Sequence, residues 1–369
     1  MFISKRFLKY LIILVILIIP TVVTFNDCKL YKEPIGSITT VHTEKMPLKH
    51  GASDQTYKQT LTIKLMNTSD VGNSYKYKNS YTTSQFATTQ YRKGQCVFLK
   101  TNVAAKNGGY GENGLKIIRQ KYDYIWAFMI SLLVCLLFAI AGRRAVLIIA
   151  SLSMNLIVFA LGMQKIIRFK DLEMLTLCMT SIFIVASLII LYGFSKKSFG
   201  AILSSSTTVL MVFGLYMLIV HFSGRIEYEY IDYANISEPI EQLYISSLIF
   251  SLLGAVMDVS ITINSTVNEI VMKAGQSTLS NIVKSIKGVS NDIMGTMINV
   301  MFFTFVGDEI PIYILKMSNG YDIITLFSNG AVFEIIRLLI GAIGIVLAVP
   351  VSGFFAVILR HKMIVKKGA

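Results

Sequence analysis

Long apolar runs separated by polar segments are the main feature of the chain. The first run, "YLIILVILIIPTVVTF", follows three basic residues and lacks a small-residue cleavage pattern, which predicts an uncleaved membrane anchor within residues 1–25. A helix needs about 20 apolar residues to cross a bilayer. Seven further runs approach that length, at residues 124–141, 145–163, 174–194, 199–222, 243–268, 292–307 and 334–359. The pattern predicts a mainly α-helical polytopic membrane protein with about 8 transmembrane helices.

Residues 26–122 have a different pattern. The stretches "IGSITTVHT", "YKQTLTIKLM" and "KGQCVFLKTN" alternate β-branched or apolar residues with polar ones, and Gly, Asn and Asp bound them. This alternation predicts a small β-rich domain, a barrel or a sandwich, directly after the first span. Cys28 and Cys96 both lie in this block; in an oxidising compartment, a disulfide and two free thiols are the two alternatives for them.

The composition supports membrane embedding, because 54% of the residues are hydrophobic and only 15% are charged. The net charge of +14 is concentrated in residues 26–122, which hold 15 basic and 6 acidic side chains, a net +9. The histidines and cysteines do not follow metal-ligand spacing, and no nucleotide-binding motif is present. We therefore expect no metal, no cofactor and no enzymatic activity. Nucleic-acid binding is disfavoured because no recognition motif accompanies the basic block.

The basic segments between the apolar runs predict the orientation. "GRRA", "SKKS" and the tail "RHKMIVKKG" fall on one side, which is the cytoplasm by the positive-inside rule. Both termini are then cytoplasmic, residues 26–122 are extracellular, and residues 123–369 form a seven-helix membrane domain. Helical apolar spacing predicts an amphipathic helix near 277–287, ending at Gly288, with its lysines toward membrane lipid. The segment 308–333 fits a re-entrant hairpin, an interfacial segment or a loop cover.

The sixth span contains an aspartate, Asp258, although a carboxylate at bilayer depth costs roughly 2.5–3.5 kcal/mol. Asp258, Thr262 and Ser265 follow one another at helical intervals and share one face of the predicted helix. This face continues with small residues that permit close helix packing, namely Ser247, Ser251 and Gly254.

The seventh span repeats the arrangement. Asp292, Thr296 and Asn299 share a face, with Gly295 beside them as a packing residue. Asp258 and Asp292 fall at similar predicted depth, which predicts a polar seam that binds a proton or a small cation at Asp258, with Asp292 as a coupled second carboxylate. The neutral ligands would be Thr262, Thr296 and Asn299.

Each carboxylate also has a structural alternative. Asp258 could serve only as a hydrogen-bonded helix contact. Asp292 follows "GVSN" at the predicted start of a helix, where the helix dipole favours a carboxylate without any further role. If a carboxylate binds an ion or proton, removal of its charge alone should abolish function; if it is only structural, function should persist.

The segments "GAVMDVSITINSTVNEI" and "NDIMGTMINVMFF" resemble the two characteristic motifs of the YibE/F family of bacterial multi-pass membrane proteins, which occur chiefly in Gram-positive bacteria. The match runs over Gly254–Asp258 and Asp292–Thr296, whereas Ser290–Asn291 stand where the family commonly has Gly-Arg. The resemblance implies a small β-rich domain after the first span, for which an OB-like fold is one option. It also implies a related family member, or a second copy of the chain, as partner.

Two functions follow from these observations. The carboxylate seam favours a transporter or permease component of the plasma membrane that couples to a proton or cation. The alternative is a non-transporting cell-envelope scaffold whose basic outer domain binds an anionic wall polymer, lipid or a protein partner. The net +9 charge of residues 26–122 motivates this alternative.

Overall fold

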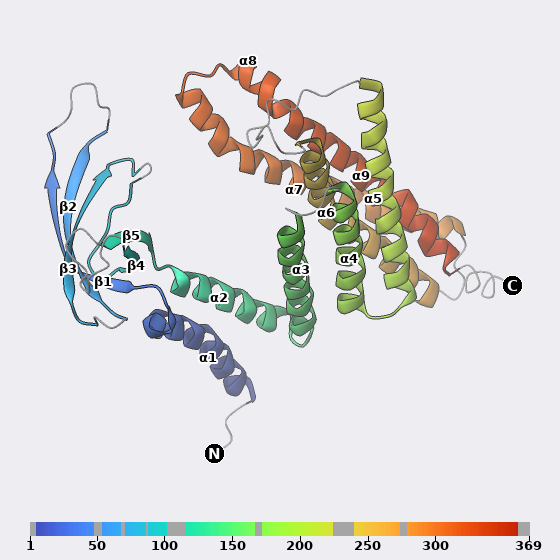
Figure 1. Cartoon of the computed structure of the whole chain (residues 1–369). Helices are drawn as coiled ribbons and strands as arrows, with labels where there is room; N and C mark the ends of the chain where they lie inside the picture. Colours follow the sequence, from blue (N-terminus) through green and yellow to red (C-terminus); the bar gives the residue numbers. More distant parts are fainter. Residues whose placement is uncertain are drawn as a thin grey trace. The chain divides into compact units, whose positions relative to one another are not determined.

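The computed structural model describes the chain at residues 5–47, 54–67, 71–85, 88–101, 115–166, 172–223, 240–273 and 279–360 (Figure 1). The chain divides into two compact units, Met1–Ala145 and Val146–Ala369. The first unit combines a β-sheet with two helices, and the second consists of helices.

The described residues of the first unit form an antiparallel sheet of five strands in the order β3-β2-β1-β4-β5. Its strands are β1 (Ile35–Lys45), β2 (Thr56–Leu65), β3 (Ser74–Thr82), β4 (Cys96–Thr101) and β5 (Leu115–Gln120). The three stretches with alternating polarity form β1, β2 and β4, because alternate side chains such as Leu61, Ile63 and Leu65 enter one buried cluster. The β-rich domain is thus confirmed, and its OB-like identity stays a prediction.

Two long helices complete this unit. Helix α1 (Lys5–Asn26) continues into a short 3-10 segment, η1 (Asp27–Leu30), and α2 (Asp123–Ala141) follows the last strand. The two helices lie side by side (Figure 1). The Ser131 hydroxyl on α2 contacts the Leu17 carbonyl of α1 at 3.2 Å. The predicted first apolar run is therefore a helix that packs against the second.

An ion cluster around the buried Lys121 side chain joins the sheet to these two helices. The Nζ atom of Lys121 lies 2.7 Å from Asp27 Oδ1 and 3.7 Å from Asp123 Oδ2, and it donates a hydrogen bond to the Thr24 carbonyl. The Tyr31 hydroxyl donates to Asp123 Oδ2 at 2.6 Å, and this hydrogen bond raises the pKa of the Tyr31 phenol. We call the four residues Asp27, Tyr31, Lys121 and Asp123 the Lys121 junction.

The second unit is built of helices. They are α3 (Arg144–Ile166, which begins at the unit boundary), α4 (Leu172–Tyr192), α5 (Lys196–Ser223), α6 (Ile240–Lys273), α7 (Leu279–Ser318), α8 (Ile323–Leu326), a short π-helical segment η3 (Phe327–Ala331) and α9 (Val332–Ile358). Helix α6 is central, because it packs against α4, α5, α7 and α9.

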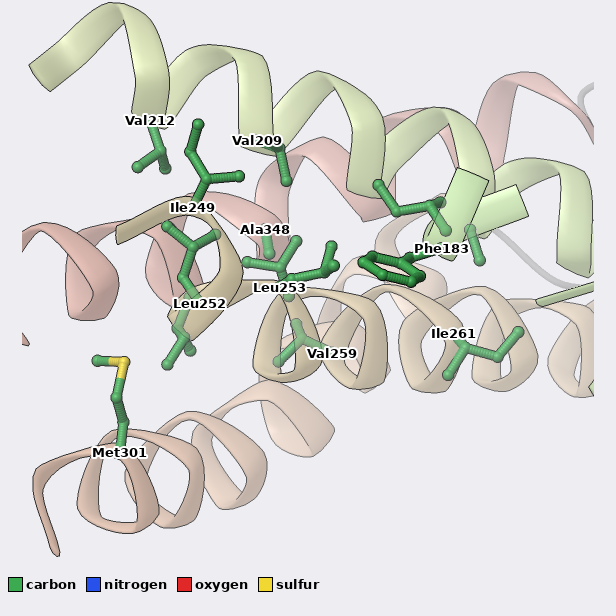
Figure 2. Close-up of a cluster of buried hydrophobic side chains, with 14 of the residues drawn as sticks. Phe183, Val209, Val212, Ile249, Leu252, Leu253, Val259, Ile261, Met301 and Ala348 are labelled. Carbon is green, nitrogen blue, oxygen red and sulfur yellow. The ribbon is translucent and has the colours of Figure 1, made fainter. Parts of the chain in front are cut away.

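Apolar side chains from several helices meet along α6. Figure 2 shows Ile249, Leu252 and Val259 of α6 among side chains from α5 and α9, with Met301 of α7 facing Leu252. These four residues are at most 5% exposed. Other positions of α6, such as Gly254 and Asp258, are not buried in this cluster and border cavities instead.

Seven of the described helices, α2 to α7 and α9, are long and apolar enough to cross a membrane. They correspond to the seven predicted spans at residues 124–359, and α1 corresponds to the predicted membrane anchor within residues 1–25. The mainly α-helical polytopic architecture is therefore confirmed.

Helix α7 differs from its predicted span of 292–307. It runs unbroken from Leu279 to Ser318, so the predicted helix end at Gly288 is wrong. Glycine costs only about 1 kcal/mol inside a helix, too little to stop one that is apolar on both sides of it. Residues 277 and 278 of the predicted amphipathic helix lie outside the described residues, and lipid contact of this segment stays a prediction.

The uncertain segment 308–333 is largely helical. After α7, the backbone turns at Gly320, whose φ of +89° favours glycine. The Asp322 side chain then caps α8 by accepting a hydrogen bond from the Ile324 amide at 3.3 Å. This construction argues against an irregular loop cover and leaves the re-entrant and interfacial alternatives.

Close helix packing occurs at Gly344 of α9, where an added Cβ would lie 2.9 Å from Val212 Cγ2 of α5. Because valine is stiff, Gly344→Ala is expected to lower the free energy of unfolding by roughly 1–2 kcal/mol. Denaturant unfolding of the detergent-solubilised protein measures this. Gly254→Ala is the matched control, since a Cβ there meets no atom within 4 Å and the substitution should leave stability unchanged or higher. Equal losses in both variants would contradict the packing argument.

Candidate functional site

A cavity of about 710 Å³ lies between α6, α7 and α9. We call it the acidic cavity, because four carboxylates and one arginine border it within the described part of the chain. Apolar atoms form much of the remaining wall, including Met297, Met301 and Phe305 of α7. Its charged residues are Asp258, Asp308, Glu309, Glu334 and Arg337.

The charged groups come from all three helices. Asp258 is contributed by α6, Asp308 and Glu309 by α7, and Glu334 and Arg337 by α9. Arg337 Nη1 donates to Glu334 Oε2 at 2.8 Å, as expected for residues three apart on a helix. Their side chains are 13% and 18% exposed, respectively.

Aromatic rings hold Arg337 at the cavity wall. Its guanidinium carbon lies 5.3 Å from the centroid of the Tyr244 ring and 5.8 Å from that of Phe305. The Tyr244 hydroxyl in turn donates to the Phe333 carbonyl at 2.8 Å, which fixes the ring. Among the residues that the structure describes, one arginine and four carboxylates border the cavity, so the ionised cavity attracts cations.

A second cavity, of about 620 Å³, lies between α3, α4 and α6. Its wall includes Asn155 of α3 and Ser187 of α4, whose side chains are hydrogen-bonded at 2.9 Å. Gly254 and Asp258 border both this cavity and the acidic cavity. Asp258 is thus accessible from two sides of α6.

The predicted ligands on α6 and α7 differ in their relation to the acidic cavity. Asp258 and the three α7 residues Asp292, Thr296 and Asn299 are all exposed, but of these four only Asp258 borders the cavity. The Thr296 hydroxyl donates within its own helix, to the Ile293 carbonyl at 2.8 Å. The ligand roles of the α7 residues stay predictions, and the acidic cavity does not depend on them.

The remaining predicted residues fall into two groups. Thr262 and Ser247 are half-buried on α6, and Ser251 borders the acidic cavity. An added Cβ at Gly254 or Gly295 would meet no atom within 4 Å, so neither glycine makes a close helix contact within the described part of the chain.

The sequence prediction did not identify Asp308 and Glu309 as site residues. It ended the seventh span at residue 307 and assigned both carboxylates to the following segment. The two carboxylates lie four to five helical turns along α7 from Asp292, the residue that was predicted to pair with Asp258. Helical spacing from Asp292 therefore did not indicate that they border the same cavity as Asp258. The apolar positions that continue beyond Glu309 could have indicated that the helix extends past residue 307 and includes both carboxylates.

A buried polar cluster at the end of α9 was also missed. Arg360 is 1% exposed and donates to Asn268 Oδ1 at 3.3 Å, to the Asn264 carbonyl at 3.2 Å and to the Ala356 carbonyl at 2.9 Å. Nearby, Ser352 of α9 donates to the Ser260 hydroxyl at 3.1 Å. Ser260, Asn264 and Asn268 recur every four residues, so a second polar stripe on α6 could have been recognised from the sequence.

Seven apolar helices, a central helix with a membrane carboxylate and an appended sheet domain define a multi-pass membrane protein. The family model described as YibE/F-like protein matches residues 129–362, and the model of the YibE/F family N-terminal domain matches residues 29–114. The chain therefore belongs to the YibE/F family, as its motifs indicated. No curated protein and no solved structure matches it significantly.

Proposed function

We propose that the protein is a transporter or permease component that binds a proton or a small cation in the acidic cavity. The observation that carries this proposal is the convergence of Asp258, Asp308, Glu309 and Glu334 from three helices on one cavity. Ionisable residues inside membrane spans are costly and occur mainly where they serve ion or substrate pathways.

Asp258 has the central role in this proposal. It borders cavities on both sides of α6, so an ion or proton bound there can be exchanged with either one. Arg337 pairs with Glu334, and Asp258 is the carboxylate that we propose for the incoming cation. Asp292 remains a proposed second carboxylate, and the same assay tests it.

Asp258→Asn is expected to lower ion flux by about tenfold or more, because the amide keeps the shape but cannot ionise or bind a proton. The measurement uses proteoliposomes that contain the full chain and an internal dye sensitive to pH, to sodium or to potassium, according to the gradient applied. Flux is driven by an imposed membrane potential in the presence of proton, sodium or potassium gradients.

Glu241→Gln is the matched control, since Glu241 is an exposed carboxylate of the same helix that borders neither cavity. It should retain wild-type flux. Asp292→Asn distinguishes the two versions of the site: loss of flux would support the predicted seam, and retention would support the acidic cavity alone. Wild-type flux no faster than that of protein-free vesicles would remove the proposal.

A second candidate function is a non-transporting envelope scaffold. In its favour, Lys58 and Lys64 of β2 and Lys76 and Lys78 of β3 are exposed, and the strand register aligns them on one face of the sheet. Such a face attracts anionic wall polymers or lipid headgroups. In this role Asp258→Asn would preserve function, so the two candidates make opposite predictions for one variant.

The proposed setting is the plasma membrane of a Gram-positive bacterium. The positive-inside pattern supports cytoplasmic termini and an extracellular sheet domain. The proposed partners are membrane lipid and either a second copy of the chain or a related family member.

A further inference from the structure

Two cysteines far apart in the sequence meet in the first unit. Cys28 lies in η1, directly after α1, and Cys96 is the first residue of β4. Both pack in one small apolar cluster with Ile35 and Phe98. We propose that Cys28 and Cys96 form a disulfide bond in the mature protein, which fixes the end of α1 to the sheet.

The two cysteines belong to the same packed cluster. Cys28 and Cys96 pack with Ile35 and Phe98 there, so the fold already brings the end of α1 and the start of β4 together, as a disulfide requires. Cys28 is only 6% exposed, whereas Cys96 is half-buried. An external oxidant therefore reaches Cys96 first.

The environment of Cys96 opposes spontaneous oxidation. Burial raises the pKa of the Cys96 thiol, and the neighbouring Cys28 raises it further, against a smaller opposite effect of Lys121. Because the thiolate is the reactive form, the pair reacts slowly unless a reactive disulfide is supplied. A protein disulfide of an oxidising compartment is the co-reactant that this chemistry requires.

The exchange has two steps. The Cys96 thiolate attacks one sulfur of the co-reactant disulfide, forms a mixed disulfide and releases the other sulfur as a thiolate. The Cys28 thiolate then attacks the Cys96 sulfur, forms the Cys28–Cys96 bond and releases the second sulfur. The co-reactant gains two electrons and the two protons that Cys28 and Cys96 lose, so it leaves as a dithiol.

The bond would lie beside the Lys121 junction. The Lys121 amide donates to the Cys96 carbonyl at 2.8 Å, and Asp27 of the junction directly precedes Cys28. Covalent and ionic links would then secure the same point, where α1 ends and the sheet begins.

The test is differential alkylation of the full chain in native membranes. Membranes are denatured with an excess of a small maleimide, then reduced, and the newly released thiols are labelled with a polyethylene-glycol maleimide that shifts the gel band. Two of the four cysteines are expected to acquire the second label in the wild type. Peptide mass spectrometry without reduction should find the Cys28 and Cys96 peptides joined, two hydrogens lighter than their sum.

Cys28→Ser should abolish the second label, and Cys178→Ser, at an exposed position of α4, should retain it in full. Reaction of all four wild-type cysteines in the first step would overturn the proposal, as would a joined peptide pair other than Cys28 with Cys96. The wild-type result needs no variant to fold. Ion flux is not involved in the readout, so failure here and failure of the proposed transport function are separable.

Discussion

Lys121→Met is expected to lower the free energy of unfolding by roughly 2–4 kcal/mol, because it leaves two half-buried carboxylates without their cation. The Lys121 side chain is 1% exposed, and Asp27, at 2.7 Å from its ammonium, is 11% exposed. Methionine has a similar length and keeps the apolar contacts of the side chain, so the loss reports on charge. The Thr24 carbonyl also loses its donor.

The measurement is denaturant unfolding of the full chain in detergent, followed by the near-ultraviolet signal of its aromatic residues. Lys116→Met is the matched control, since Lys116 is an exposed lysine of β5, the strand that ends next to Lys121. The double variant Asp27→Asn/Lys121→Met should regain part of the lost stability by removing the unpaired charge. Lys121→Met with wild-type stability would show that the junction does not hold the unit together.

The helical architecture could be predicted because membrane spans are long apolar runs. The predicted spans 124–141 and 334–359 agree closely with α2 and α9. Inside a bilayer the backbone must satisfy its own hydrogen bonds, so an apolar run of sufficient length has one available structure. In the same way, period-two alternation defined β1 and β2, because only one side of each strand is buried.

The Lys121 junction could not be predicted from local patterns. Its members come from η1, the end of the sheet and the start of α2, and each is an ordinary polar residue in its own segment. Their meeting depends on how the strands return to the membrane helices. Periodicity carries no information on such long-range contacts.

The candidate site was partly predictable for the same physical reasons. Asp258 was identified because a carboxylate stands out in an apolar run, and helical spacing correctly grouped Asp292, Thr296 and Asn299 on one exposed face of α7. Spacing establishes which residues share a face, whereas the neighbour that the face meets depends on the rotation of the whole helix. The acidic cavity instead takes Asp308 and Glu309 from further along α7.

Arg360→Ala is expected to lower the free energy of unfolding by roughly 2–4 kcal/mol. The substitution removes a 1% exposed side chain and deprives two buried backbone carbonyls and Asn268 Oδ1 of their donor. Arg360→Lys should recover only part of this loss, because a single ammonium cannot match the three separate acceptor positions of the guanidinium.

Denaturant unfolding in detergent compares both variants with Arg143→Ala, which alters an exposed arginine in the turn before α3. The control should unfold like the wild type. Since Arg360 bonds to α6 from the end of α9, its loss should also detach this helix end and raise hydrogen exchange at the amides of residues 353–360. Wild-type stability together with unchanged exchange in Arg360→Ala would mean that apolar packing alone secures α9 against α6.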